Sequence, residues 1–112
     1  MLTKAVLRTM RDMRPLHHPD VSTITLPMML SALADEVRLT VVRRLAEAGG
    51  VVCGQFDVPV SMSTLSHHLK VLREAGLLRV TPEGSFRRHE LRLPEMEARF
   101  PGVLSSILKT AP

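Results

Sequence analysis

The sequence predicts a mainly α-helical domain with one β-hairpin, and three observations carry this prediction. Apolar residues recur at three- and four-residue steps through most of the chain, which is the spacing of one helix face. The chain has no Trp or Tyr and only three Phe, so its core must be built from Leu, Val, Ala and seven Met. That composition suits helices better than stacked sheets. Only residues 77–93 alternate as strands do, on either side of a Pro-Glu-Gly sequence.

The bulk composition indicates one basic globular domain. The chain has 112 residues, 45% of them apolar, which is enough for one modest core and argues against disorder. Its net charge of +4 permits a nucleic acid or an anionic membrane surface as partner but proves neither. No apolar run approaches the roughly 20 residues of a membrane span, and there is no signal-peptide core. Cys53 is the single cysteine, which excludes an internal disulfide, so we expect a cytoplasmic protein without a membrane partner.

The first predicted element is a short basic amphipathic helix. Residues 2–14 place Lys and Arg among apolar residues at helical spacing. Residues 15–20, "PLHHPD", contain two prolines and break this helix. We therefore assign residues 1–20 to a basic N-terminal helix and a linker.

Two helices are expected next. Pro27 suits the first turn of a helix over "LPMMLSAL". Asp35 can cap a second helix over residues 36–48, which Gly49 would end. Residues 51–60 mix apolar residues with Gly and Pro and predict a turn or a short irregular segment.

The stretch "SMSTLSHHLKVLREAG", residues 61–76, predicts a helix of about four turns that Ser61 caps and Gly76 ends. At 100° per residue its leucines share one side, which His68 flanks. His67 lies on the opposite side with serines and a lysine. His68 is therefore expected to be a partly buried histidine with one hydrogen bond, and the polar side is either plain solvated surface or a contact surface. Adjacent histidines diverge on a helix, so they do not predict a metal site.

A hairpin and two helices follow. Residues 77–81 and 85–93 read as strands, and residues 82–84 as the turn between them. The sequence "PEMEARF" starts a short helix, and Pro101 opens a last helix with a continuous apolar face.

A helix face of small polar residues followed by a basic hairpin is typical of DNA reading. Ser and Thr let the backbone approach base edges, and their hydroxyl groups donate or accept hydrogen bonds. Arg87 and Arg88 lie beside the hairpin tip, so one of them can reach phosphates or the minor groove whichever way the strand faces.

Over residues 26–108 the chain resembles the ArsR/SmtB family of bacterial winged helix-turn-helix repressors. Three stretches carry the resemblance: "ALADEVRLTVVRRLAEAGG", "SMSTLSHHLKVLREAGLLRV" and "EGSFRRHELRL". The most specific pattern is Ser-x-Ser-Thr-x-Ser-x-His-Leu-x-x-Leu-x-x-Ala-Gly-Leu in the second stretch. The resemblance implies a winged helix-turn-helix domain for DNA binding and dimerisation over residues 21–112. It also implies a homodimer through the N- and C-terminal helices, with the helix at 61–75 in the major groove of an operator.

These expectations name two sets of residues. The DNA-binding candidates are Met62, Ser63, Thr64, Ser66, His67, Lys70, Arg87 and Arg88. The dimer-interface candidates are Leu26, Met29, Leu30, Phe100, Val103, Leu104, Ile107 and Leu108.

The chain departs from the family pattern at two places. The family's first helix of the helix-turn-helix is replaced by "GQFDVPV", which predicts a turn and leaves the angle of the recognition helix open. The family's metal sites lack their ligands, because Cys53 has no Cys-x-Cys partner and the last helix has neither Asp nor His. Nickel or zinc remains an alternative through a non-standard site, whose candidate ligands are His17, His18, Asp20 and Cys53.

The sequence thus predicts a repressor that binds a palindromic operator as a homodimer. No nucleophile–base pair or phosphate-binding glycine loop is recognisable, so we do not expect an enzyme. The alternative is a winged-helix protein-interaction module or co-regulator with weak DNA binding, and a second regulatory protein is a further possible partner. The placement of charge decides between them. A DNA reader needs a basic surface made of Lys70, Arg73, Arg87, Arg88 and also Arg79, whereas a protein-binding module would show an apolar patch there.

Overall fold

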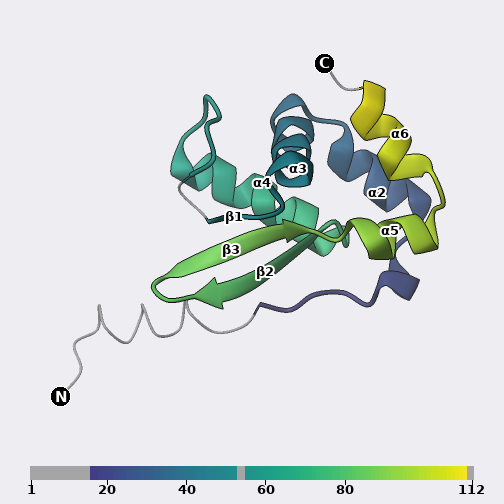
Figure 1. Ribbon diagram of the computed structural model, residues 1–112, viewed down its shortest axis with the longest axis horizontal. Helices are drawn as coiled ribbons and strands as arrows, with labels where there is room; N and C mark the ends of the chain where they lie inside the picture. Colours follow the sequence, from purple (N-terminus) through teal and green to yellow (C-terminus); the bar gives the residue numbers. More distant parts are fainter. Residues whose placement is uncertain (1–15, 53–54, 111–112) are drawn as a thin grey trace.

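The computed structural model describes residues 16–52 and 55–110. Within them, a short 3-10 helix η1 precedes five α-helices and three strands. In chain order these are η1 (Val21–Thr23), α2 (Leu26–Leu33), α3 (Glu36–Ala48), β1 (Val51–Val52), α4 (Met62–Glu74), β2 (Leu78–Glu83), β3 (Phe86–Leu91), α5 (Leu93–Arg99) and α6 (Val103–Thr110). The predicted class, helices with one hairpin in winged-helix order, is confirmed. In Figure 1 the β2–β3 hairpin extends away from the helices as the wing. The basic helix predicted at 2–14 and Cys53 lie outside the described residues.

Side-chain caps fix where the helices begin. The Asp35 carboxylate accepts from the backbone N–H groups of Val37 and Arg38 at 2.9 and 3.0 Å. Ser61 Oγ accepts from the backbone N–H of Thr64 at 3.2 Å. Both predicted caps are confirmed, as is Pro27 in the first turn of α2. Each such cap stabilises its helix by about 1 kcal/mol.

The sheet is antiparallel with the order β1-β3-β2. Val51–Val52 is a strand that pairs with β3, which corrects the prediction of an irregular segment at those two residues. The hairpin turn is also shorter than predicted. Pro82 pairs with Arg87, and Glu83 with Phe86, so Gly84 and the next residue alone make the turn. Pro82 is tolerated because β2 is an edge strand, where a residue without an N–H can face outward.

One apolar core joins the helices to the sheet. Sixteen hydrophobic side chains are buried, and α4 contributes Leu65, Leu69 and Leu72. Gly76, after α4, shows how tightly the chain packs. Its φ is +81°, and a Cβ there would lie 2.8 Å from Ile24 Cγ1. Only glycine fits this turn without displacing the fully buried Ile24. No helix within the described ranges is long and apolar enough to cross a membrane.

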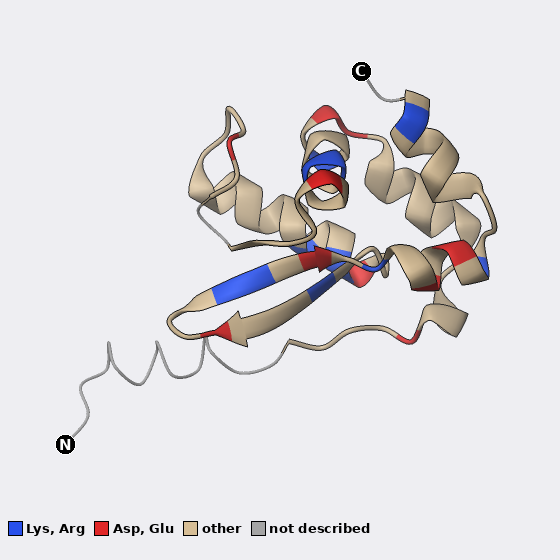
Figure 2. Ribbon diagram, viewed as in Figure 1, with Lys and Arg blue, Asp and Glu red and all other residues tan. Residues whose placement is uncertain are grey.

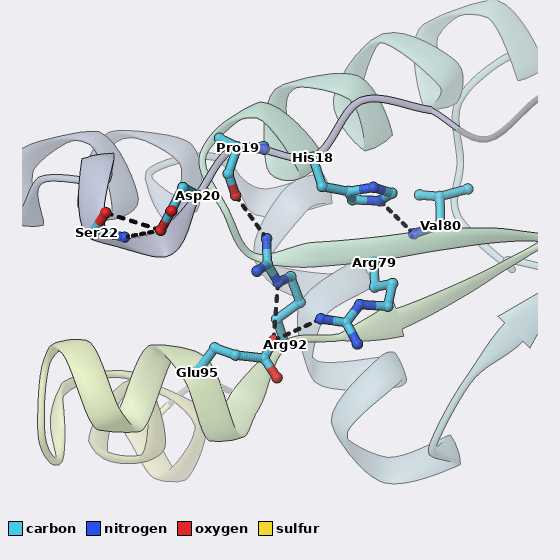
Figure 3. A network of polar contacts seen from close by, with 8 residues as sticks. All are labelled: His18, Pro19, Asp20, Ser22, Arg79, Val80, Arg92 and Glu95. Atoms are coloured by element: carbon cyan, nitrogen blue, oxygen red, sulfur yellow. Dashed lines mark hydrogen bonds and ion pairs between the residues drawn. The ribbon is translucent and has the colours of Figure 1, made fainter.

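Residues 16–20, predicted to form a flexible linker, lie along the wing instead. His18 Nε2 accepts a hydrogen bond from the backbone N–H of Val80, at 2.9 Å (Figure 3). Arg92 donates to the carbonyl of Pro19 at 3.2 Å and to the carboxylate of Glu95 at 2.9 Å. The N-terminal segment therefore covers part of the exposed edge of β2, which would otherwise offer its N–H groups to another chain.

We expect the fold to lose stability as the pH falls below about 6.5, in part through His18. Burial first, and then the charges of Arg92, Arg73 and Arg79, lower the pKa of His18. The unfolded chain therefore takes up a proton more readily than the folded one. The stabilisation by neutral His18 is complete above the unfolded pKa and is lost as the pH falls toward the folded pKa.

His18→Asn should therefore make the free energy of unfolding depend less on pH between about pH 7.5 and 5. Urea denaturation at a series of pH values measures this. His17→Asn, at the exposed neighbouring position, is the matched control. If the two variants flattened the pH dependence equally, the contact between His18 and the wing would not be its source.

Candidate nucleic-acid interface

Helix α4 presents one polar face to solvent. The leucines at 65, 69 and 72 are at most 5% exposed and face the core, as the helical spacing predicted. The opposite face carries the exposed candidates Met62, Ser63, Thr64, Ser66, His67 and Lys70. The structure therefore brings these six predicted residues together on one accessible surface.

The hydroxyl groups at the start of α4 form a small cluster. Ser61 Oγ donates to Thr64 Oγ1 at 3.0 Å, and Ser61 Oγ lies 3.2 Å from Ser63 Oγ. Because Thr64 Oγ1 accepts from Ser61, its own hydroxyl hydrogen is available to an external acceptor. A hydroxyl that is oriented in this way can donate to, or accept from, a base edge in the major groove.

The adjacent histidines of α4 have different surroundings. His67 is exposed, whereas His68 is half-buried and its Nδ1 accepts from Arg38 Nη1 at 3.1 Å. Arg38 also donates from Nε to the carbonyl of Ala32 at 2.6 Å. One guanidinium therefore joins α2, α3 and α4. The sequence predicted a partly buried His68 with one hydrogen bond, but it did not identify Arg38 as the partner.

The contacts of Arg38 help to orient α4, because the segment directly before α4 forms no helix. Residues 55–60 contain no helix, as the sequence predicted for "GQFDVPV". Phe56, Val58 and Val60 nevertheless pack against the core from this segment. The orientation of α4 therefore depends on its buried leucines, on Arg38 and on the packing of these three residues before it.

The two arginines of the wing lie on opposite faces of the sheet. Strand alternation places Arg87 on the face with buried His89, the side on which Ser66, Lys70 and Arg73 of α4 lie. Arg88 lies on the other face, where it forms ion pairs with Glu83 at 3.7 Å and Glu90 at 3.3 Å. Figure 2 shows basic residues toward the tip of β3 and an acidic residue toward its end.

The predicted basic surface is therefore smaller than the sequence suggested. Arg79 shares the outer sheet face with Arg88 and lies 3.4 Å from Glu95. Lys70 forms one exposed pair with Glu74 at 4.0 Å, which contributes little because both groups are solvated. The basic concave surface between α4 and the wing is made by Lys70, Arg73 and Arg87.

Two of the four candidate metal ligands, His18 and Asp20, are engaged in other contacts. His18 Nε2 is occupied by the wing, and the Asp20 carboxylate accepts from the backbone N–H and the hydroxyl of Ser22. The backbone N–H bond lowers the pKa of Asp20 below its usual range. His17 is exposed, and Cys53 is outside the described part of the chain. Among residues 16–52 and 55–110, no three His, Cys, Asp or Glu side chains come close enough to hold a metal.

The predicted interface residues divide between core and surface. Met29 and Leu104 are fully buried in the core, because each faces inward from its helix, so neither is available to a partner. Leu26 and Leu30 of α2 are 37% and 42% exposed. The half-buried candidates are Phe100, Val103, Ile107 and Leu108. Met28 and Phe86 are also exposed, although nothing in the sequence pattern distinguished them.

The comparisons with known proteins agree with this geometry. Residues 33–81, from the end of α2 into β2, match a helix-turn-helix domain family. The chain is 32% identical over 82 residues to the uncharacterized HTH-type transcriptional regulator YceK of Bacillus subtilis, covering 70% of this chain and 82% of that protein.

Two further relatives match shorter stretches. The HTH-type transcriptional regulator Rv2034 of Mycobacterium tuberculosis is 44% identical over 62 residues, 54% of this chain and 57% of its own length. The putative arsenical resistance operon repressor ArsR of Halobacterium salinarum is 40% identical over 65 residues, 55% of this chain and 50% of its own length. The chain thus spans most of the Bacillus protein but only about half of the other two.

The Arg38 bridge makes His68 a structural residue. His68→Ala should lower the free energy of unfolding by about 1–3 kcal/mol, because it leaves a half-buried guanidinium N–H without its acceptor. His67→Ala, on the exposed face next to it, should change the free energy by less than about 0.5 kcal/mol. Urea denaturation of both variants tests this. Equal decreases in the two would contradict the role given to Arg38.

Proposed function

The chain belongs to the ArsR-type family of helix-turn-helix transcriptional regulators, and from this premise we propose that it represses transcription by binding a palindromic operator as a homodimer. As a member of this family it is a DNA-binding transcription regulator, a class of proteins that are generally not enzymes. The repressor role is suggested by the name of the Halobacterium relative, a putative operon repressor.

The proposal rests on one observation: two features of the surface lie on the same side of the molecule. The exposed polar face of α4 and the basic concave surface of Lys70, Arg73 and Arg87 meet at Ser66 and Lys70, which belong to both. A duplex that meets the hydroxyl groups of α4 would also meet cationic side chains next to them. The rival, a protein-binding module, needs an apolar patch there instead, and the residues lining this concave surface include three cations.

We assign different tasks to the two groups of residues. Ser63, Thr64, Ser66 and His67 read base edges in the major groove, and Met62 contacts apolar groups of the bases. Lys70 and Arg87 contact phosphates, which fixes the position of the protein without reading sequence. Arg88 has a lesser part, because Glu83 and Glu90 already hold its guanidinium on the opposite sheet face.

The dimer is proposed to form through α2 and α6. Leu26 and Leu30 are one turn apart on α2 and expose apolar surface, and Figure 1 places α6 at the same end of the molecule. Phe100, Val103, Ile107 and Leu108 are packed on the core from one side and remain partly exposed on the other. The proposed interface uses these six residues and omits the buried Met29 and Leu104.

Mutations can separate base reading from phosphate contact. DNA upstream of the coding region of this protein is the operator to test first, with a random duplex of equal length beside it. Ser63→Ala or His67→Ala should reduce discrimination between the two duplexes, by about 1–3 kcal/mol for each hydrogen bond to a base that the substitution removes. Arg87→Gln should weaken binding to both duplexes and reduce the slope of log K against log salt by about one.

Arg88→Gln is the matched control for Arg87→Gln, because it removes the same charge from the opposite sheet face. Its effect on affinity and on the salt slope should be clearly smaller. If the four variants behaved alike, the division between reading and positioning would be wrong. If the wild type did not prefer the operator at any salt concentration, the repressor proposal would be wrong.

Dimerisation has its own test. Sedimentation at micromolar concentration should give twice the mass of the chain. Leu30→Asp places a charge on the proposed interface and should shift the protein toward the monomer. Phe86→Asp makes the same kind of change at an exposed apolar residue of the wing and should leave the mass unchanged. A wild-type monomer at these concentrations would contradict the arrangement.

A further inference from the structure

A cavity of about 360 Å³ lies between α4 and the wing. It is bounded by α4 on one side, by β2 and β3 on another, and by Leu16 of the N-terminal segment. Cavities that hold small molecules measure about 300–1,000 Å³. This one is therefore large enough for a small organic ligand, and it shares Ser66, Lys70 and Arg87 with the proposed DNA surface.

The lining of the cavity has two chemical parts. Leu16, Leu69 and Val80 supply apolar surface, and Lys70, Arg73 and Arg87 supply positive charge. Ser66 and His89 complete the described lining, which contains no acidic side chain. A ligand that fits both parts has an apolar body and an anionic group.

Two residues of the lining, Arg73 and His89, have buried polar atoms. Arg73 Nε and His89 Nδ1 are buried and have no well-aligned hydrogen-bond partner among the described residues, although the backbone of Val51 and of Arg87 interacts with the His89 ring. His89 is only 4% exposed, so water reaches it poorly. A buried polar group without a partner costs about 1–3 kcal/mol, and such groups are rare in folded proteins. Both atoms are themselves shielded from solvent, so the cavity is distinguished by its lining, in which cationic side chains stand next to apolar surface.

We propose that the cavity between α4 and the wing binds a small organic anion, a carboxylate or phosphate ester with an apolar body, and that this ligand displaces operator DNA. The anionic group lies between Arg73 and Arg87, and the apolar body lies on Leu69 and Val80. Guanidinium groups suit this task because they bind planar or tetrahedral anions with paired N–H groups.

Regulation follows from the shared residues and rests on the proposed DNA-binding function. A ligand whose anionic group occupies Arg87, beside Lys70, removes Arg87 from the phosphates of the duplex. Binding of the anion and of the operator must then weaken each other by the same factor. No change of fold is required for this release.

The first experiment measures ligand binding without DNA. Phenyl phosphate, inorganic phosphate and benzyl alcohol are titrated into the full chain by NMR and by calorimetry. Phenyl phosphate should bind about tenfold or more tightly than inorganic phosphate, because its ring is buried on the apolar surface. Benzyl alcohol, which lacks the charge, should bind more weakly still. Equal binding of the two phosphates would overturn the proposal and leave a site for a DNA phosphate alone.

The resonances of His89 give a readout of location. Burial first, and then the charges of Arg87 and Arg73, lower the pKa of His89. An anion between these arginines should offset their charges and raise the pKa of His89, which the ring protons report. A ligand bound elsewhere would leave that pKa unchanged, and this result would also contradict the proposal.

Substitution of single arginines tests whether Arg73 and Arg87 bind the anion. Arg73→Gln and Arg87→Gln should each weaken phenyl phosphate binding about tenfold or more, which corresponds to roughly one charge-assisted hydrogen bond. Arg79→Gln removes an arginine from the outer sheet face and should bind as the wild type does. Thermal unfolding confirms that each variant is folded, and Arg87→Gln serves if Arg73→Gln is not. Weaker binding in Arg79→Gln alone would overturn the assignment.

The last experiment adds DNA. Phenyl phosphate at saturation should weaken operator binding, and operator DNA should weaken phenyl phosphate binding by the same factor. If the anion binds but the operator is not recognised, the DNA-binding proposal fails and the cavity stands. If the operator is recognised but the anion does not bind, or binds without competition, the inference fails and the DNA-binding proposal stands.

Discussion

The orientation of α4 is the constraint on which the rest of this surface depends. The helix has 13 residues, and burial of Leu65, Leu69 and Leu72 fixes its rotation about its own axis. Each buried leucine contributes about 1.5–3 kcal/mol, so a rotation that exposed them would cost several kilocalories per mole. Because the helical period is fixed, the same burial presents Ser63 and His67 to solvent. The same spacing of leucines therefore both stabilises α4 and presents its polar face to solvent.

The Arg38 guanidinium complements the apolar packing with directional bonds. Apolar contacts fix which side of α4 is buried, but they are non-directional and tolerate small shifts along the helix. Arg38 of α3 contacts the carbonyl of Ala32 in the last turn of α2 and Nδ1 of His68, so it holds α4 to α2 and α3 at a defined position. In a chain whose residues 55–60 form no helix, this bond supplies part of what a preceding helix would supply.

Local chemistry could be predicted from the sequence, and long-range partners could not. The caps at Asp35 and Ser61, the leucine face of α4 and the exposure of His67 all follow from residues within a few positions of one another. The pairing of Val51 with His89 and the bond from Val80 to His18 join residues far apart in the chain. Periodicity within one segment contains no information about such partners.

Burial of individual residues shows the same division. The apolar stripes of α2 and α6 were evident, but a stripe does not tell which of its members face the core. Met29 and Leu104 proved to be fully buried, whereas Leu30 is 42% exposed.

Strand alternation likewise separates Arg87 from Arg88 but does not say which of them faces α4. The neighbours decide, and here Glu83 and Glu90 bind Arg88 on the outer face. The net charge of +4 was therefore a weak guide. The acidic residues of the wing neutralise its outer face. The inner face keeps the positive charge that binding of DNA phosphates or of a small organic anion requires.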